Sequence, residues 1–207
     1  MAKRRNIDNR SEENFCMRCG ARLVRVRMEG RLRPVCRRCG WIHFKNPASA
    51  SAVVIISEGR VVLVKRKVPP HVGSWCLPAG FQEYDEGPEE TAVREVKEET
   101  NLDVQIQKLH KIFFSTAHPD THAVVHVYFG EKVGGQMRPG DDVSSVRMFP
   151  LDKLPSRVAF KSHLEVIEQF KEKRRRRTKP RKGMQRRKPS TPNRGSIKPR
   201  MNTDTHG

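Results

Sequence analysis

The sequence predicts a mixed domain of α+β or layered α/β/α type, preceded by a small cysteine-rich module and followed by a basic tail. Three observations support this. Stretches rich in valine and isoleucine alternate with helical patterns through the middle of the chain. Two Cys-x2-Cys pairs lie near the N-terminus. The net charge of +19 over 207 residues divides into +9 for residues 1–47, −3 for 48–170 and +13 for 171–207.

These changes in composition predict four segments: a basic N-terminal arm (1–14), a cysteine module (15–47), an α/β domain (48–172) and a disordered basic tail (173–207). The tail has almost no apolar residue to bury, which favours disorder. It is either an electrostatic arm for RNA or DNA or a solubilising tail without a fixed partner, because charge alone defines no site.

The composition also indicates where in the cell the protein is expected. Mean hydropathy is −0.73, and no run approaches the ~18 apolar residues of a membrane span. The basic N-terminal residues are not followed by an apolar stretch, so we expect neither a signal peptide nor membrane insertion. A cytoplasmic protein with reduced thiols is expected.

The cysteine module has the spacing of a zinc ribbon. Cys16 and Cys19 are separated by 16 residues from Cys36 and Cys39, and a glycine follows each pair and lets the backbone turn. Four thiolates leave no open coordination position, so a structural zinc ion is expected. Many arginines in this module could hold phosphate, but without interleaved aromatic residues a solvated basic face is favoured.

The remaining elements follow from hydrophobic patterns. Within the cysteine module, Leu23–Met28 and Leu32–Val35 predict a hairpin. The middle of the chain predicts strands at Ser49–Ser57, Arg60–Arg66, Leu102–Phe114, Ala123–Phe129 and Val146–Phe149. Helices are predicted at Pro88–Thr100 and Lys161–Lys173, the latter with Leu164, Ile167 and Phe170 on its buried side.

The first helix places three carboxylates on one face. On a helical wheel, Glu95, Glu98 and Glu99 lie within about 100° of one another. Two such charges about 4 Å apart would repel by about 4 kcal/mol at an effective dielectric of 20. Mg²⁺ or Mn²⁺, which accept oxygen ligands and bind phosphates, would cancel this repulsion. The alternative is a solvated acidic helix face.

The segment from Gly80 to Leu102 resembles the Nudix box, which is Gly, five residues, Glu, seven residues, Arg-Glu, an aliphatic residue, any residue, Glu-Glu, any residue, Gly and an aliphatic residue. The matching positions are Gly80, Glu86, Arg94, Glu95, Val96, Glu98, Glu99 and Leu102. Asn101 stands where the family usually has Gly. Asn is the common substitute at a left-handed position after a helix, so we expect little damage.

This resemblance implies an α/β/α sandwich and metal-dependent hydrolysis of a nucleoside diphosphate linked to another moiety, with Mg²⁺ or Mn²⁺ as cofactor. The metal ligands that it implies are Glu95, Glu98, Glu99 and the Gly80 carbonyl. Asp141 or Asp142 would be a further ligand, and Asp142 is preferred. Arg94 would orient the glutamates as part of the catalytic set, and Glu86 would support them as a salt-bridge partner. The resemblance does not identify the catalytic base.

The resemblance extends to a zinc-ribbon branch of the family that includes enzymes acting on ADP-ribose, FAD and NADH. It is carried by Phe15–Pro47, Trp75–Phe81 and Arg147–Leu151. The segment Phe113–Pro119 lacks the motif of NADH diphosphatases, which favours an ADP-ribose- or FAD-like substrate over NADH. Many relatives are dimers, which suggests a homodimer.

Two other functions stay open: the same chemistry on nucleotide-capped RNA, and a non-enzymatic zinc-ribbon protein that binds nucleic acid. The substrate-binding residues are not identified. Tyr84 could stack on a base, whereas Trp75 and Phe81 are expected in the core. Zinc binding by His118, His122 and His126 is not favoured, and Cys76 is expected to be a buried small hydrophobic residue.

Overall fold

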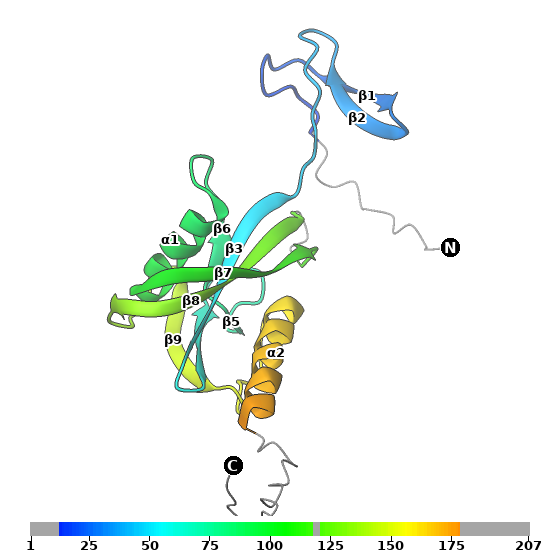
Figure 1. The fold of residues 1–207 in the computed structure, drawn as a ribbon. Coiled ribbons are helices and arrows are strands. Elements are labelled where there is room, and N and C mark those ends of the chain that lie inside the picture. Colours follow the sequence, from blue (N-terminus) through cyan, green and yellow to red (C-terminus); the bar gives the residue numbers. More distant parts are fainter. Residues whose placement is uncertain (1–12, 118–120, 179–207) are drawn as a thin grey trace, which may run out of the picture.

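A computed structural model describes residues 13–117 and 121–178 of the chain. Most of the predicted N-terminal arm, the basic tail from residue 179 and His118 therefore lie outside the described residues. Figure 1 shows a small hairpin module at one end, a layered α/β body, and a second helix leading towards the C-terminus. Over the described ranges, no helix has the length and hydrophobicity that a membrane crossing requires.

The N-terminal module is an antiparallel hairpin. Strands β1 (Leu23–Met28) and β2 (Arg31–Cys36) pair in register from Leu23 opposite Cys36 to Met28 opposite Arg31. The two residues between the strands both have positive φ, which matches the right-handed twist of a tight hairpin. The predicted hairpin is confirmed, with β2 one residue longer at each end.

The body contains a seven-stranded mixed sheet. Its strands are β3 (Ala48–Ser57), β4 (Arg60–Arg66), β5 (Trp75–Cys76), β6 (Ala79–Phe81), β7 (Leu102–Ser115), β8 (Ala123–Gly135) and β9 (Val143–Pro150). The order is β5-β4-β3-β8-β7, with β6 paired to β3 and β9 paired to β4. The β3–β8 pair is parallel, whereas the other pairs are antiparallel. The sequence pattern misses the short strands β5 and β6 and makes β8 and β9 too short.

Helices α1 (Pro88–Thr100) and α2 (Lys161–Thr178) complete the layers. The bounds of α1 are those predicted. Helix α2 continues five residues beyond the predicted end at Lys173, so the proposed boundary between domain and tail falls inside a helix. Lys and Arg are good helix formers, which is why the basic run extends α2.

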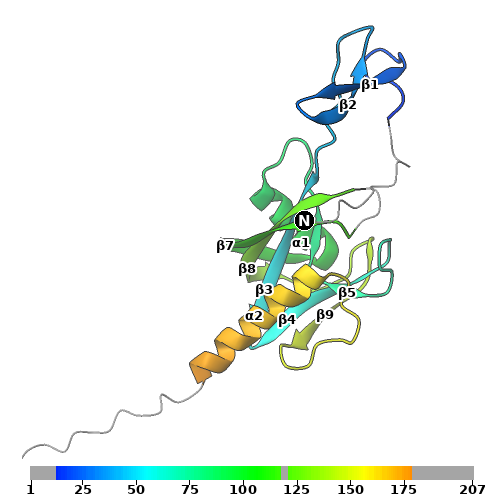
Figure 2. The same cartoon turned by 90° about the vertical axis from the view of Figure 1, so that its right-hand side faces the viewer.

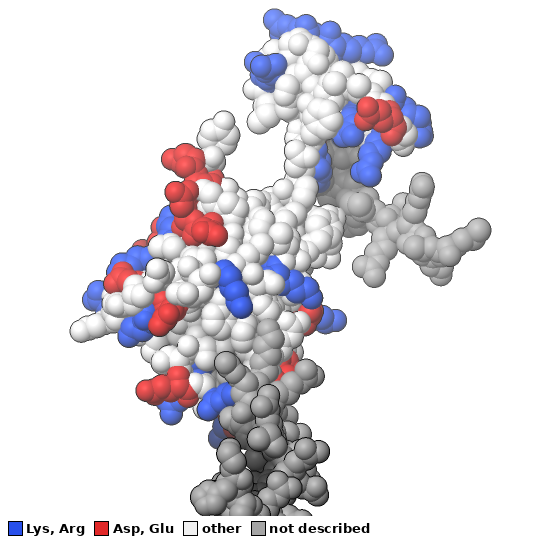
Figure 3. Space-filling view, viewed as in Figure 1, with Lys and Arg blue, Asp and Glu red and all other residues white. Residues whose placement is uncertain are grey.

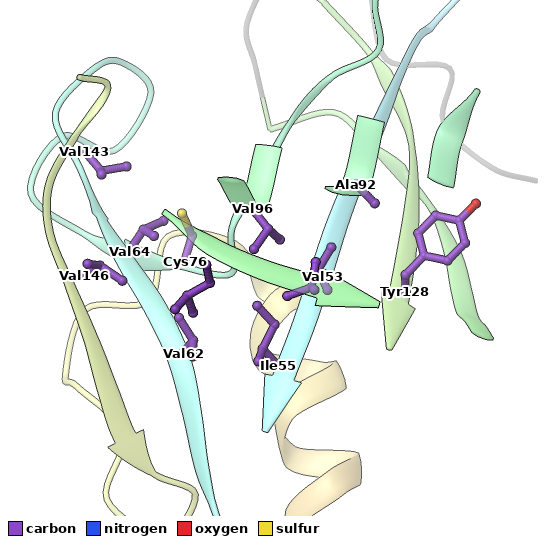
Figure 4. Close-up of a cluster of buried hydrophobic side chains, with 12 residues drawn as sticks. Val53, Ile55, Val62, Val64, Cys76, Ala92, Val96, Tyr128, Val143 and Val146 are labelled. Atoms are coloured by element: carbon purple, nitrogen blue, oxygen red, sulfur yellow. The ribbon is translucent and has the colours of Figure 1, made fainter. Parts of the chain in front are cut away.

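The alternation of side chains along β3 and β4 separates two cores. Val53 and Ile55 of β3 belong to a cluster that includes Ala92 and Val96 of α1, shown in Figure 4. The residues between them face a second cluster that includes Val166 and Ile167 of α2. The sheet is therefore covered by α1 on one face and α2 on the other, and Figure 2 shows the two helices on either side of it.

One helix-face prediction is wrong. Leu164 is 39% exposed, whereas Ile167 is fully buried and Phe170 packs on the second cluster as predicted. His163 and Val166 are buried on the side where Leu164 was expected. The fold is thus the α/β/α sandwich expected from the sequence, preceded by the cysteine module.

Candidate active site and metal centres

Local signals fix both ends of α1. Pro88 is the first helical residue, and the carboxylate of Glu90 accepts the backbone N–H of Gly87 at 2.6 Å. At the other end Asn101 adopts the left-handed conformation (φ 57°, ψ 16°), and its backbone N–H donates to the carbonyl of Lys97 at 2.8 Å. The expectation that Asn can replace Gly here is confirmed in geometry.

Strand β6 brings backbone against the carboxylate face of α1. Gly80 pairs with Ser51 of β3, which holds β6 in the sheet. A Cβ atom at Gly80 would lie 2.0 Å from Oε1 of Glu95. Only glycine therefore allows this carboxylate to lie against the strand, and this explains the glycine that opens the motif.

Arg94 gathers three carboxylates. Its guanidinium donates to both oxygens of Glu86 (2.6 and 2.9 Å), to Glu95 at 2.8 Å and to Glu98 at 2.9 Å. A further N–H donates to the carbonyl of Phe81 at 2.9 Å. The hydrogen bonds from Arg94 lower the pKa of Glu86 to about 2, so Glu86 is a permanently charged anchor.

Burial disfavours the charged forms of Glu99 and Glu95. Burial raises the pKa of Glu99 to about 8, and the negative charges of Glu95 and Asp142 add to this, although the backbone N–H of Ala79 donates to Glu99 at 3.0 Å. Burial also raises the pKa of Glu95. Partly buried carboxylates that repel one another are a donor set that a divalent cation would stabilise, so these residues fit the implied metal.

The three glutamates nevertheless have different partners. Glu95 and Glu98 share Arg94, whereas Glu99 is bound to Ala79. Within the described part of the chain, four cysteines form the only group of three or more His, Cys, Asp or Glu whose ligand atoms all lie within 4.8 Å of one another. Glu95, Glu98 and Glu99 are thus on one helix face, as predicted, but are not closed around one point.

Of the two aspartates considered, Asp142 is the better placed. The preceding loop packs on the end of α1, where the N–H of Gly140 donates to the carbonyl of Glu99 at 3.3 Å. The charge of Asp142 contributes to the raised pKa of Glu99. Asp141 binds Lys67 Nζ through its carbonyl oxygen at 3.1 Å.

A cavity of about 190 Å³ lies on the other side of β6 and was not predicted. Its lining includes Arg66, Pro70, Gly80, Phe81, Phe160 and His163. Phe81, expected in the core, is 51% exposed and lines this cavity, so that prediction is wrong. The signals in the sequence are an arginine at the end of a strand before Pro69-Pro70, and a histidine at an apolar position of α2.

The other aromatic and histidine residues have ordinary environments. Trp75 packs edge-on against Phe149 at 4.7 Å between ring centroids, as expected for a core residue, and Tyr84 is exposed. His122 lies against Phe114, and Nδ1 of His126 lies 3.3 Å from the carbonyl of Ala50.

The cysteine cluster is a second candidate metal centre. The sulfur of Cys16 lies 3.6 Å from that of Cys39, and the sulfur of Cys19 lies 3.5 Å from that of Cys36. The glycines after the two pairs both have positive φ, as their position predicts. The backbone N–H of Cys39 lowers the pKa of the Cys36 thiol to about 6, which favours a thiolate. Four converging sulfurs are the ligand set of a structural zinc site.

Cys76 is separate from this cluster. It is buried beneath the carboxylate face, and burial raises the pKa of its thiol to about 12. It therefore behaves as the small hydrophobic residue that was predicted.

Comparisons with known proteins agree with this geometry. A family model described as the NUDIX domain matches residues 45–170. The ADP-ribose pyrophosphatase of Methanocaldococcus jannaschii is 34% identical over 128 residues, which cover 61% of this chain and 75% of that protein. The NAD-capped RNA hydrolase NudC of Pseudomonas aeruginosa is 32% identical over 142 residues, 68% of this chain and 49% of that protein. This chain thus spans about half the length of NudC.

The solved structures agree as well. The crystal structure of a NUDIX hydrolase from Nitrosomonas europaea is 30% identical, covers 79% of this chain and 93% of that chain, and has a TM-score of 0.72. The family match spans more than half of the 207 residues and includes the whole Arg94–glutamate network. The chain belongs to the Nudix hydrolase family.

Proposed function

We propose that this protein is a metal-dependent pyrophosphohydrolase that cleaves ADP-ribose- or FAD-like nucleoside diphosphates into a nucleoside monophosphate and a phosphorylated moiety. The observation that carries the proposal is the Arg94 network. One guanidinium holds Glu86, Glu95 and Glu98, while Glu99 lies half-buried on the same helix with a raised pKa. A merely solvated acidic face would leave its carboxylates exposed and unperturbed.

Mg²⁺ or Mn²⁺ would be held by Glu95, Glu98, Glu99, the Gly80 carbonyl and Asp142. When bound, the metal polarises phosphoryl oxygens, lowers the pKa of water and neutralises the leaving phosphate. Arg94 orients Glu95 and Glu98, and the N–H of Ala79 holds Glu99. Glu86 keeps Arg94 in place and stays ionised because its pKa is about 2.

The substrate class rests on the relatives and on one sequence feature. The M. jannaschii relative is named an ADP-ribose pyrophosphatase. The segment from Phe113 to Pro119 does not carry the NADH-diphosphatase motif, so NADH ranks below ADP-ribose and FAD.

A substrate panel tests the proposal. Purified protein with Mg²⁺ or Mn²⁺ is incubated with ADP-ribose, FAD, NADH, NAD and dinucleoside polyphosphates, and the products are identified by mass. We expect AMP from ADP-ribose or FAD, and a large loss of this activity in E99Q but not in E89Q, an exposed glutamate of the same helix. Protein that is inactive on the whole panel yet binds RNA would instead support the non-enzymatic function.

We also propose that the four cysteines bind a structural zinc ion, so that residues 15–47 form a zinc ribbon. A 33-residue module can bury too little apolar surface to be stable alone, and metal ligation would supply the missing stability. Metal analysis of the purified protein should find one zinc per chain. A zinc-free protein with an ordered hairpin would contradict this.

A second candidate function is hydrolysis of nucleotide-capped RNA. It is favoured by the relatives named NAD-capped RNA hydrolases and by the arginines of the ribbon, which Figure 3 shows as basic side chains over this module, while acidic side chains gather on the side of α1. Removal of residues 179–207, or the double substitution R27Q/R31Q, should then slow hydrolysis of capped RNA much more than that of the free dinucleotide. Equal effects on both substrates would exclude an RNA-specific role.

The homodimer stays a prediction, and light scattering of the purified protein would test it.

A further inference from the structure

The cavity on the far side of β6 adjoins the carboxylate site. Ala79 and Gly80 line it, and the same two residues contact the glutamates: the N–H of Ala79 donates to Glu99, and Gly80 lies against Glu95. Pockets that enclose a whole drug-sized ligand have volumes of roughly 300–1,000 Å³. A cavity of about 190 Å³ is smaller, so it suits one part of a substrate whose remainder lies at the carboxylates.

Arg66, at the end of β4, is fixed in the wall of this cavity. Its Nε donates to the carbonyl of Pro70 at 2.7 Å, and its Nη2 donates to the carbonyl of Pro69 at 3.1 Å. The guanidinium also lies over the ring of Phe160, 5.3 Å from its centroid, and contacts the Cys76 thiol. A guanidinium has five N–H donors, so these contacts hold its plane while leaving donors for a ligand.

His163 supplies a second donor. Its side chain lines the cavity, is only 3% exposed, and accepts the backbone N–H of Leu77 through Nδ1 at 3.1 Å. Burial lowers the pKa of His163 to about 3, so the ring is neutral and its proton is on Nε2. The hydrogen bond that the structure gives His163 uses Nδ1, so Nε2–H is the donor that faces a ligand in the cavity.

The charge of the cavity selects an anionic ligand. Its described lining contains Arg66 and several hydroxyl groups but no Asp or Glu. A base could also present acceptors to an arginine, as guanine does through O6 and N7. However, Arg66 pairs with Val143 of β9, the residue after Asp142, and the backbone N–H of Lys67 donates to the carbonyl of Asp142 at 3.1 Å, so Arg66 lies at the carboxylate end of the cavity. A diphosphate bound at the carboxylates would reach this end before a base would.

We propose that Arg66 is a substrate-binding residue that holds a phosphate of the nucleoside diphosphate next to the bond that is cleaved, with His163 Nε2–H as a second donor. This inference rests on the proposed function of the carboxylate site. The Pro69 and Pro70 carbonyls and the Phe160 ring keep the guanidinium in place, so that it binds the phosphate without first being reoriented.

The test compares R66Q and R66K with R60Q, a control at the exposed opposite end of the same strand. The measurements are kcat and KM for ADP-ribose, and the affinities for AMP, ribose 5-phosphate and adenosine by titration calorimetry. Loss of a charge-assisted hydrogen bond predicts that R66Q raises KM and weakens binding of the phosphorylated halves roughly 10- to 100-fold. Adenosine binding should change less than about threefold, R66K should recover part of the affinity, and R60Q should behave like wild type.

Three outcomes would overturn the inference. If AMP and adenosine are weakened equally by R66Q, then Arg66 contacts the base. If R66Q keeps the wild-type KM and phosphate affinity, then it has no role in binding. If both R66Q and R66K lose Mn²⁺ binding and thermal stability together, then the role of Arg66 is structural. Failure of the proposed function gives a different result, because wild-type protein would then hydrolyse no diphosphate. The role of Arg66 could still be judged in that case from the affinities for AMP and adenosine.

Discussion

The two candidate metal centres of this chain are built in opposite ways. Four cysteine sulfurs converge within 4.8 Å from two turns of one small hairpin module. The glutamates of α1 lie on one helix face but turn to different partners, Arg94 for Glu95 and Glu98, and the N–H of Ala79 for Glu99. The first centre is closed and depends on short-range spacing, whereas the second is open and depends on β6, Glu86 and Arg94 in the surrounding fold.

This difference corresponds to two uses of a metal. A closed set of four thiolates stabilises a fold and leaves no position for a substrate. An open carboxylate set keeps positions for water and phosphate, but it must be supported by neighbouring groups. Removing one ligand should therefore unfold the first centre and inactivate the second.

The largest expected effect is on the ribbon. Because structural zinc in small metal-dependent folds supplies roughly 10–16 kcal/mol, C36A should abolish amide-exchange protection of the hairpin Leu23–Cys36 while the Nudix domain stays folded. Hydrogen exchange with mass spectrometry would measure this. The control C76A removes a buried thiol outside the cluster and should keep the zinc. A protected hairpin in C36A would show that the ribbon does not need its metal.

The next effect is on catalysis. E95Q keeps the size of the side chain but removes a charge at the proposed metal site, so kcat for ADP-ribose should fall by roughly 10²- to 10⁴-fold. The thermal midpoint should remain close to that of wild type. Steady-state kinetics beside E89Q, which alters an exposed glutamate of α1, would measure the difference. Comparable activity in E95Q and E89Q would refute the assignment of Glu95.

A smaller effect is expected at the residue that supports the ligands. Lysine cannot bind Glu86 in a bidentate manner while also reaching Glu95 and Glu98, so R94K should lower kcat/KM by about 10- to 100-fold. K97M is the matched control, because Lys97 pairs with Asp103 on the surface. This substitution should change kcat/KM less than threefold. Full activity of R94K would mean that the carboxylates are positioned without the guanidinium.

The smallest predicted effect concerns pH and stability. The folded protein without divalent metal raises the pKa of Glu99 from 4.5 to about 8, so folding is favoured by a bound proton. This contribution is complete below pH 4.5 and is lost as the pH rises through about 8. In buffer without Mg²⁺ or Mn²⁺, E99Q should therefore be more stable than wild type by about 1–3 kcal/mol at pH 8.5, with little difference near pH 4.5. Urea titrations of both proteins at the two pH values would measure this difference in unfolding free energy. Equal stability at pH 8.5, or a less stable E99Q, would contradict the prediction.

The same contrast explains what could be predicted from the sequence. The ribbon, α1 and the motif from Gly80 to Leu102 follow from spacings within a few turns of chain, and the structure confirms their elements. Strands β5 and β6 have only two and three residues, too short for a periodic pattern. The cavity joins Arg66 to His163, which are 97 positions apart, and no local pattern links them.

Two further differences between prediction and structure have a shared cause. Composition predicts that the tail begins at residue 173, whereas the helical propensity of Lys and Arg continues α2 to Thr178. The residue type of Phe81 predicts a position in the core, whereas β6 ends at this residue and Phe81 lines the cavity. In both cases the neighbouring structure, and not the residue type, decided the outcome.

Whether the carboxylates of α1 bind a divalent metal can be measured without any choice of substrate, by titrating Mn²⁺ and following it by electron paramagnetic resonance. We expect wild-type protein to remove the signal of free Mn²⁺, E99Q to bind Mn²⁺ at least tenfold more weakly, and C36A to bind it like wild type. If wild-type protein leaves the free Mn²⁺ signal unchanged, or if E99Q binds Mn²⁺ with wild-type affinity, then the carboxylates of α1 are not a metal site.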